Sequence, residues 1–263
     1  MNIKHRKRIV EMVHRGGDGH IPSAFSIIDI IDFLYTKVLN VKKSNLNSPN
    51  RDFFILSKGH GCLALYSVLY EKKILRNKDI REFCTNKGIL GEHPDMTKVP
   101  GAEASTGSLG HGLSFAIGIA KGLKMQKKKN KVFVLCGDGE CQEGTVWEAA
   151  NIARNHKLNN LILIIDFNKS GAQLLPYDPM VKKWKGFGWK VEEIDGHSTY
   201  DFKKVFSKKK LNNLKLPYVV VANTTKGKGA KILEGHGPWH HRIPSRSEVK
   251  MLNREIDKYY EKK

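Results

Sequence analysis

Four short apolar runs limit the folds open to this 263-residue chain. They are rich in β-branched or aromatic residues and occupy 53–56, 132–135, 161–167 and 218–222. They do not alternate apolar with polar residues, which is typical of parallel strands buried on both faces. Helix-period segments lie between them, at 26–39 and 61–72 for example. This alternation predicts a three-layer, doubly wound α/β fold with a parallel sheet, which we expect to form one domain over residues 1–263.

The net charge of the chain restricts its partners only loosely. Forty-six Lys and Arg against 26 Asp and Glu give a formal charge of +20, which suits nucleic acid, anionic lipid or an acidic protein. The lysines, however, are spread over the whole chain, and aromatic residues do not interleave with them as on a stacking platform. We therefore expect lysine-rich solvated faces and an acidic partner chain, and not a nucleic-acid function.

Other features of the composition indicate a cytoplasmic protein. The basic start of the chain is not followed by an apolar segment of signal-peptide type. The longest stretch without charged residues, 104–120, holds four glycines, one histidine and several hydroxyl residues and would make a poor membrane span. The four cysteines form no Cys-x-x-Cys pair, so we expect free thiols and no structural zinc site of that kind.

Polar residues follow two of the predicted strands at the sheet edge where doubly wound folds bind ligands. Gly137-Asp138-Gly139 comes after the run at 132–135, and Asn168 comes after the run at 161–167. A lone Gly-Asp-Gly also fits a tight turn with a solvated carboxylate. Together, however, Asp138 and Asn168 supply two oxygen ligands that could share one cation. Two protein ligands leave room for water and diphosphate oxygens, which suits magnesium.

These residues and their spacing resemble the thiamine diphosphate signature, and further motifs resemble transketolase specifically. The motifs follow the family order: Gly19-His20-Ile21-Pro22-Ser23, Ser57-Lys58-Gly59-His60, Glu92-His93-Pro94-Asp95, Ser105 to Gly112, Gln142-Glu143-Gly144, Asp195-Gly196-His197, Thr224 to Gly229 and Trp239-His240. Each motif alone is weak, but the complete series covers nearly the whole chain. The resemblance implies the thiamine-diphosphate-binding fold, with thiamine diphosphate and Mg²⁺ as cofactors.

The resemblance also implies which residues contact the cofactor and its metal. The glycine-rich turn Gly107-Ser108-Leu109 is expected to contact the aminopyrimidine, and backbone amides at such a helix start suit cofactor groups. The other cofactor-binding residues implied are Ser23, Lys58, His60, Gly137, Asp138, Gly139, Asn168, Lys226 and His240. The implied metal ligands are Asp138, Asn168 and the backbone oxygen of Ser170.

Catalytic roles follow from the family positions of the histidines. By resemblance, His20, His93 and His240 face the sugar oxygens, and neutral imidazoles can donate, accept and shuttle protons there. Glu143 would sit at a subunit interface in a proton network that joins two active sites. Taken alone, it would be a carboxylate that the dipole at a helix start stabilises.

Two departures from the family pattern bear on the substrate. The first motif reads His20-Ile21-Pro22-Ser23-Ala24, without the paired glycines of many two-subunit members. The stretch 168–184 is shortened, and its Ser170-Gly171-Ala172-Gln173 matches the family poorly. Magnesium binding survives these departures, whereas the identity of the sugar does not follow from them.

The resemblance further implies that the pyrimidine-binding domain lies on another chain. Transketolases carry the glutamate that activates the aminopyrimidine on a second domain, and this chain ends at Lys263, before that domain. We therefore expect a separate pyrimidine-binding partner chain, two copies of each chain in the complex, and an active site between them. The expected activity is transfer of a two-carbon ketol unit from a ketose, a phosphate ester by preference, to an aldose.

Two alternatives to this function remain from the sequence. One is a related subunit of a ketol-transfer enzyme or ligase that uses a modified or nucleotide-linked sugar. The other is a non-catalytic basic binding protein on a degenerate thiamine fold, against which the intact Asp138, Asn168 and histidines argue. A decarboxylase or 2-oxoacid dehydrogenase chain would share the Gly-Asp-Gly but not these histidines.

Overall fold

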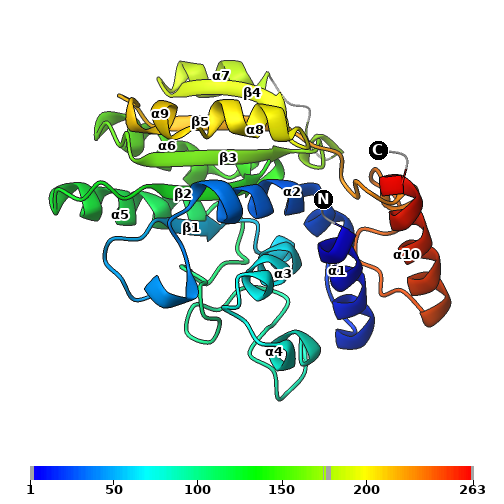
Figure 1. Ribbon diagram of the computed structural model, residues 1–263. Coiled ribbons are helices and arrows are strands. Elements are labelled where there is room, and N and C mark those ends of the chain that lie inside the picture. The colour runs from blue at the N-terminus through cyan, green and yellow to red at the C-terminus, as the bar shows by residue number, and fades with distance from the viewer. Residues whose placement is uncertain (1–2, 174, 176–178, 262–263) are drawn as a thin grey trace.

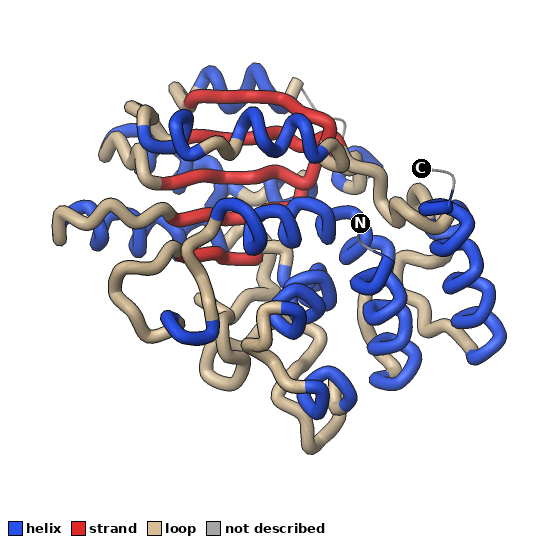
Figure 2. The backbone as a smooth tube through the Cα atoms, in the orientation of Figure 1, coloured by secondary structure: helices blue, strands red, loops and turns tan. Residues whose placement is uncertain are grey.

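The computed structural model describes residues 3–173, 175 and 179–261 and contains one parallel sheet with the strand order β1-β2-β3-β5-β4. The strands are β1 (Phe53–Leu56), β2 (Val132–Gly137), β3 (Leu161–Phe167), β4 (Lys190–Asp195) and β5 (Tyr218–Asn223). Figures 1 and 2 show the strands stacked in this order with helices in front of and behind them. The predicted α/β fold class is thus confirmed.

Ten α-helices are described. They are α1 (Ile3–Gly16), α2 (Ile21–Phe33), α3 (Cys62–Glu71), α4 (Asn77–Arg81), α5 (Gly112–Met125), α6 (Gly144–Asn155), α7 (Met180–Gly186), α8 (Thr199–Val205), α9 (Lys208–Asn212) and α10 (Arg246–Glu261). A short π-helical turn, Leu34–Val38, continues α2. No helix among the described residues is long and apolar enough to cross a membrane.

The two faces of the sheet pack against separate groups of helices. In β3, Ile162 and Ile164 belong to the core formed with α1, α2, α3 and α8, whereas Leu163 and Ile165 belong to the core formed with α5, α6 and α7. Successive strand residues point to opposite faces. Both sets must therefore be apolar, which explains why the central strands read as unbroken apolar runs.

Strand β4 was not predicted from the sequence. Four of its six residues are charged, and most of the six are exposed or half-buried. It pairs only with β5 and forms one edge of the sheet. An edge strand needs less apolar surface than a central one, so the pattern used for the other strands missed it.

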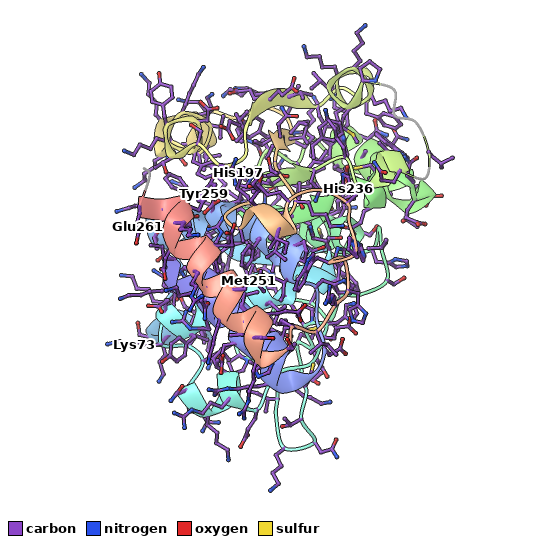
Figure 3. The ribbon with its side chains drawn as sticks, turned by 90° about the vertical axis from the view of Figure 1, so that its right-hand side faces the viewer. Lys73, His197, His236, Met251, Tyr259 and Glu261 are labelled. Carbon is purple, nitrogen blue, oxygen red and sulfur yellow. The ribbon has the colours of Figure 1, made fainter. Side chains whose placement is uncertain are left out.

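Arg6 of α1 connects α1 with three other segments of the chain. Its guanidinium is fully buried, donates to both carboxylate oxygens of Asp29 on α2 at 3.1 and 2.9 Å, and donates from Nε to the Lys228 carbonyl oxygen at 2.7 Å. It also lies over the ring of Tyr260 on α10. Figure 3 looks onto α10, which packs beside α1 and carries the labelled Met251, Tyr259 and Glu261.

Arg6→Met should lower the free energy of unfolding by about 3 kcal/mol or more, because it leaves Asp29 without its principal cation in a buried setting. The matched control is Arg15→Met, which removes an exposed pair with Glu11 on the same helix and should cost about 0.5 kcal/mol or less. Urea unfolding of both variants measures the difference. Equal effects would show that the Arg6 contacts do not hold these segments together.

Candidate active site

The predicted site residues converge where the parallel strands end. Gly137 of β2 is in register with Asp166 of β3, so Asp138 and Asn168 follow these strands side by side. Lys58 and His60 follow β1, and Lys226 comes three residues after β5. Because carboxyl ends of parallel strands share one sheet edge, residues far apart in the sequence meet here.

Asp166 organises this edge, although the sequence analysis did not single it out. It is completely buried and accepts hydrogen bonds from Lys58 Nζ at 2.5 Å, Ser26 Oγ at 2.6 Å and Asn168 Nδ2 at 2.9 Å. The hydroxyl of Thr224 donates to it as well. A charged residue inside an otherwise apolar strand was the available signal, since such a charge is stable only when it is paired.

The contacts of Asp166 orient Asn168. Its amide nitrogen faces Asp166, and its Oδ1 accepts a hydrogen bond from the backbone nitrogen of Ser170 at 3.0 Å. The carbonyl oxygen of Ser170, predicted as a metal ligand, accepts from the Gln173 nitrogen at 3.2 Å. Each oxygen retains a second lone pair for another partner. Part of the shortened loop, residues 174 and 176–178, lies outside the described residues.

Asp138 is the group in this edge that lacks a complete set of partners. Its Oδ1 accepts from the Gly139 nitrogen at 2.8 Å, whereas its Oδ2 is buried with no hydrogen-bond partner in the described part of the chain. Burial, and next the negative charge of Asp166, raise the pKa of Asp138 to about 6. A buried, unpartnered carboxylate oxygen fits a cation, so the residues present fit the expected magnesium.

Glu140 fixes the position of the glycine-rich turn, and the sequence analysis missed it too. This carboxylate is almost fully buried and accepts from Ser57 Oγ at 2.6 Å, the Gly137 nitrogen at 2.7 Å and the Gly110 nitrogen at 2.9 Å. Gly110 has a φ of +81°, and a Cβ there would lie 2.7 Å from Cβ of Glu143. Only glycine suits this position.

Several predicted residues lie around this turn. Ser108 and Leu109 are exposed, and Glu143 is exposed at the start of α6. His93 is half-buried against the backbone, since a Cβ on either Gly59 or Gly107 would approach its ring to 2.9 or 3.1 Å. The exposed Glu143 is thus at the protein surface, whereas His93 lies against the backbone of the turn.

Three of the predicted histidines form a cluster above the strand ends. The ring centroid of His20, which precedes α2, lies 5.4 Å from that of His60 and 5.2 Å from that of His240. Lys226 Nζ contacts Nδ1 of His240 at 2.7 Å. Ser23 is buried on the first turn of α2, three residues after His20.

The protonation of this cluster follows from its burial. Burial, and next the charge of Lys58, hold the pKa of His60 well below its usual range. Burial, and next Lys226, lower the pKa of His240 to about 4. Burial, and next Lys58, lower the pKa of Lys226 to about 8. Near neutral pH the histidines are thus neutral and Lys226 is mostly charged.

Comparison with known proteins gives a consistent assignment. The family model "Transketolase, thiamine diphosphate binding domain" matches residues 3–259. This chain belongs to the transketolase family. The comparisons therefore confirm the predicted family, a thiamine diphosphate-binding domain, and the class of transketolase-type transferase subunits.

The similar proteins include subunits of divided transketolases. One is an apulose-4-phosphate transketolase subunit of Phocaeicola vulgatus, 37% identical over 98% of this chain and 93% of that protein. Another is a 6-deoxy-6-sulfo-D-fructose transketolase subunit of a Clostridium species, 36% identical over 88% of this chain and 85% of that protein. The crystal structure of the Campylobacter jejuni transketolase superposes with a TM-score of 0.84 at 27% identity. The match spans 98% of this chain but 47% of that structure.

Asp138→Asn should stabilise the metal-free protein at pH 7 by about 1–3 kcal/mol, because it removes a charge that burial disfavours. The pKa of Asp138 is higher in the folded state than in the unfolded state. The penalty is therefore absent below about pH 4, grows between about pH 4 and 6, and is complete above that range. Urea unfolding in a chelator at both ends of this range measures it.

The exposed pair of Asp257 and Lys7 provides the control, since Asp257→Asn should change stability by about 0.5 kcal/mol or less. If Asp138→Asn destabilised the protein equally at both pH values, Asp138 would instead be a well-solvated or well-paired structural carboxylate.

Proposed function

We propose that this chain is the diphosphate-side subunit of a two-chain transketolase that requires thiamine diphosphate and magnesium. It would transfer a two-carbon ketol unit from a ketose to an aldose. One observation carries the proposal: the unpartnered oxygen of Asp138 and the neutral histidine cluster lie at the same sheet edge. A metal site and a proton-handling site are thus neighbours, which a degenerate binding fold would not need.

Magnesium would be held by Asp138, Asn168 and the backbone oxygen of Ser170. Lys58 and Lys226 supply positive charge near the strand ends, where the diphosphate would lie, and Glu140 ties the turn at 107–112 to the same ends of β1 and β2. When bound, thiamine diphosphate supplies the carbanion chemistry of carbon–carbon bond cleavage. The protein supplies orientation and control of protons.

The hydrogen bonds of His240 define what this residue can do to a sugar. Lys226 Nζ is charged and donates to Nδ1 of His240, so the single proton of the neutral ring resides on Nε2. His240 therefore presents a hydrogen-bond donor, aligned by Lys226, to a sugar oxygen. His60, also neutral, and His20 border the same space and can accept or return protons.

An apolar surface beside the site is suited to the partner chain. It consists of Leu109, Phe115, Met125 and Ile152, on the glycine-rich turn, α5 and α6, and each of these side chains is more than a third exposed. Helices α5 and α6 pack against each other and cover the same face of the sheet, so these exposed side chains come from one layer of the molecule. Exposed apolar residues of this kind mark protein interfaces. The apulose-4-phosphate transketolase relatives are themselves named as subunits and are matched over almost their full length, which supports a partner chain here as well.

Two classes of sugar are candidates for the donor substrate. The similar subunits are named for apulose-4-phosphate and for 6-deoxy-6-sulfo-D-fructose. A modified sugar is therefore the second candidate, beside an ordinary ketose phosphate.

We propose a complex of two copies of each chain, a cytoplasmic location, and an acidic partner to complement the charge of +20.

The isolated chain should show no ketol transfer, and mixing it with its cognate partner should produce activity that needs thiamine diphosphate and magnesium. Phe115→Asp should abolish the complex and the activity, because it places a charge in the apolar surface. Tyr200→Asp on α8, on the opposite face of the sheet, is the matched control. Size-exclusion chromatography and an aldose-acceptor assay measure both. Robust ketol transfer by the isolated chain would contradict the two-chain model.

His240→Ala and His20→Ala should each slow ketol transfer by the complex about 10²–10⁴-fold, the usual effect of losing a positioned proton-transfer group. His156→Ala, which removes an exposed histidine at the end of α6, should leave turnover unchanged. Steady-state kinetics and circular dichroism separate lost chemistry from lost folding. Wild-type turnover in both site variants would refute the proposed roles.

A further inference from the structure

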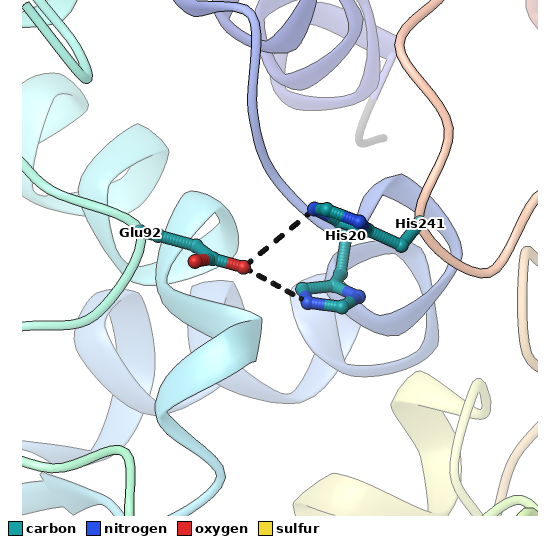
Figure 4. Close-up of side chains that lie close together, drawn as sticks. All are labelled: His20, Glu92 and His241. Atoms are coloured by element: carbon teal, nitrogen blue, oxygen red, sulfur yellow. Dashed lines mark hydrogen bonds and ion pairs between the residues drawn. The ribbon is translucent and has the colours of Figure 1, made fainter.

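A second group of possible ligands shares His20 with the histidine cluster. It consists of His20, Glu92 and His241, and one ligand atom from each lies within 4.8 Å of the others (Figure 4). Glu92 and His241 are not among the residues that the family resemblance assigned to catalysis or cofactor binding. The three come from the segment before α2, the loop after α4 and the loop before α10.

The hydrogen bonds of His20 are incomplete without a further positive group. Its Nδ1 lies 3.1 Å from the carbonyl oxygen of His240, and its Nε2 lies 3.1 Å from Oε1 of Glu92. Both neighbours are acceptors, whereas a neutral imidazole has a single N–H. If Nδ1 donates to the carbonyl oxygen, the lone pair of Nε2 faces a carboxylate. A metal ion between Nε2 and Oε1 would remove this conflict.

The contact at Nδ1 is the one that metal-binding histidines usually make. Such a residue donates its second ring N–H to a backbone carbonyl or carboxylate, which fixes the tautomer and the direction of the ligating nitrogen. His20 is oriented in this way by His240. It is also held at the first residue before α2, so its ring position is set by the fold.

Glu92 lies close enough to both imidazoles for all three to share one metal ion. With metal–ligand distances of about 2.0–2.2 Å, neighbouring ligands of zinc lie roughly 3.3 Å apart. Oε1 of Glu92 is 3.1 Å from Nε2 of His20 and 3.8 Å from Nε2 of His241. Oδ1 of Asp18 lies 2.8 Å from Nε2 of His241, so a carboxylate or water is available for the fourth position.

We propose that His20, Glu92 and His241 form a binding site for a zinc-type divalent metal ion, distinct from the magnesium site at Asp138. Two imidazoles and one carboxylate favour zinc, nickel or copper over magnesium, which prefers oxygen ligands. A set of three protein ligands with one open position is also the arrangement of zinc sites that remain accessible to small molecules.

One consequence rests on the function proposed above. A metal on Nε2 of His20 occupies the nitrogen that would face the sugar, so metal and sugar compete for the same residue. Zinc should then inhibit ketol transfer in competition with the sugar, and a chelator should reverse the inhibition. Metal binding itself requires neither the partner chain nor the cofactor, so it can be tested even if the proposed reaction is wrong.

The test is calorimetric titration of the isolated, tag-free chain with zinc, in excess magnesium so that hard-cation sites are filled. We expect one zinc ion per chain. Glu92→Gln and His241→Ala should each weaken binding at least about tenfold, as even the loss of an orienting partner costs about 10–100-fold. His156→Ala controls for an exposed histidine, and Cys84→Ser controls for the cysteine that is only half-buried. Neither should alter the affinity.

Cobalt absorption spectra provide a second readout, because a tetrahedral site of mixed nitrogen and oxygen ligands gives visible bands that Glu92→Gln and His241→Ala would remove. Thermal unfolding without metal shows whether the variants are folded. Failure of the wild-type chain to bind zinc at micromolar concentration would overturn the proposal. Equal affinity in the wild type and both site variants would overturn it as well.

Discussion

The buried ion pair of Lys58 and Asp166 is the constraint on which this sheet edge depends. Both groups are almost completely removed from solvent, and the two oxygens of Asp166 accept four donors from four segments of the chain. Desolvation of such a pair consumes much of its attraction, so its main effect is geometric and not a large gain in stability. Lys58, which follows β1, can reach β3 only across the end of β2. The pair therefore fixes three strand ends relative to one another.

Two buried carboxylates at this edge differ in how many hydrogen-bond donors they have. Glu140 receives three donors and holds the glycine-rich turn against β1 and β2. Asp138, two residues earlier, keeps one oxygen without a hydrogen-bond partner among the described residues. An unsatisfied buried charge costs free energy that the rest of the fold must supply, and such groups persist mainly where a ligand completes them. This difference indicates that Glu140 has a structural role and that Asp138 is available to a ligand.

The sequence predicted four of the five strands and drew attention to most residues that gather at the candidate site, and what it missed has physical causes. Strands β2, β3 and β5, and the edge strand β1, are mostly buried on both faces, so their composition alone revealed them, whereas β4 at the other edge carries exposed charges. Asp138, Asn168 and the histidines were found because they occupy recognisable motifs. Asp166 and Glu140 act through partners distant in sequence, such as Lys58, 108 residues from Asp166. Glu92 and His241 likewise meet only through the fold, at 3.8 Å.

The charges at the strand ends also bear on how ligands enter. Two basic side chains, Lys58 and Lys226, face two acidic ones, Asp138 and Asp166, so the formal charges of the four are balanced. Burial raises the pKa of Asp138 to about 6 and lowers that of Lys226 to about 8. A diphosphate alone would add negative charge beside two carboxylates, and a divalent cation alone would add positive charge beside two lysines. In a medium of low dielectric constant either imbalance is costly. Entry of the metal and the diphosphate together avoids both costs, so the balance of these four residues favours joint binding over binding of either ligand alone.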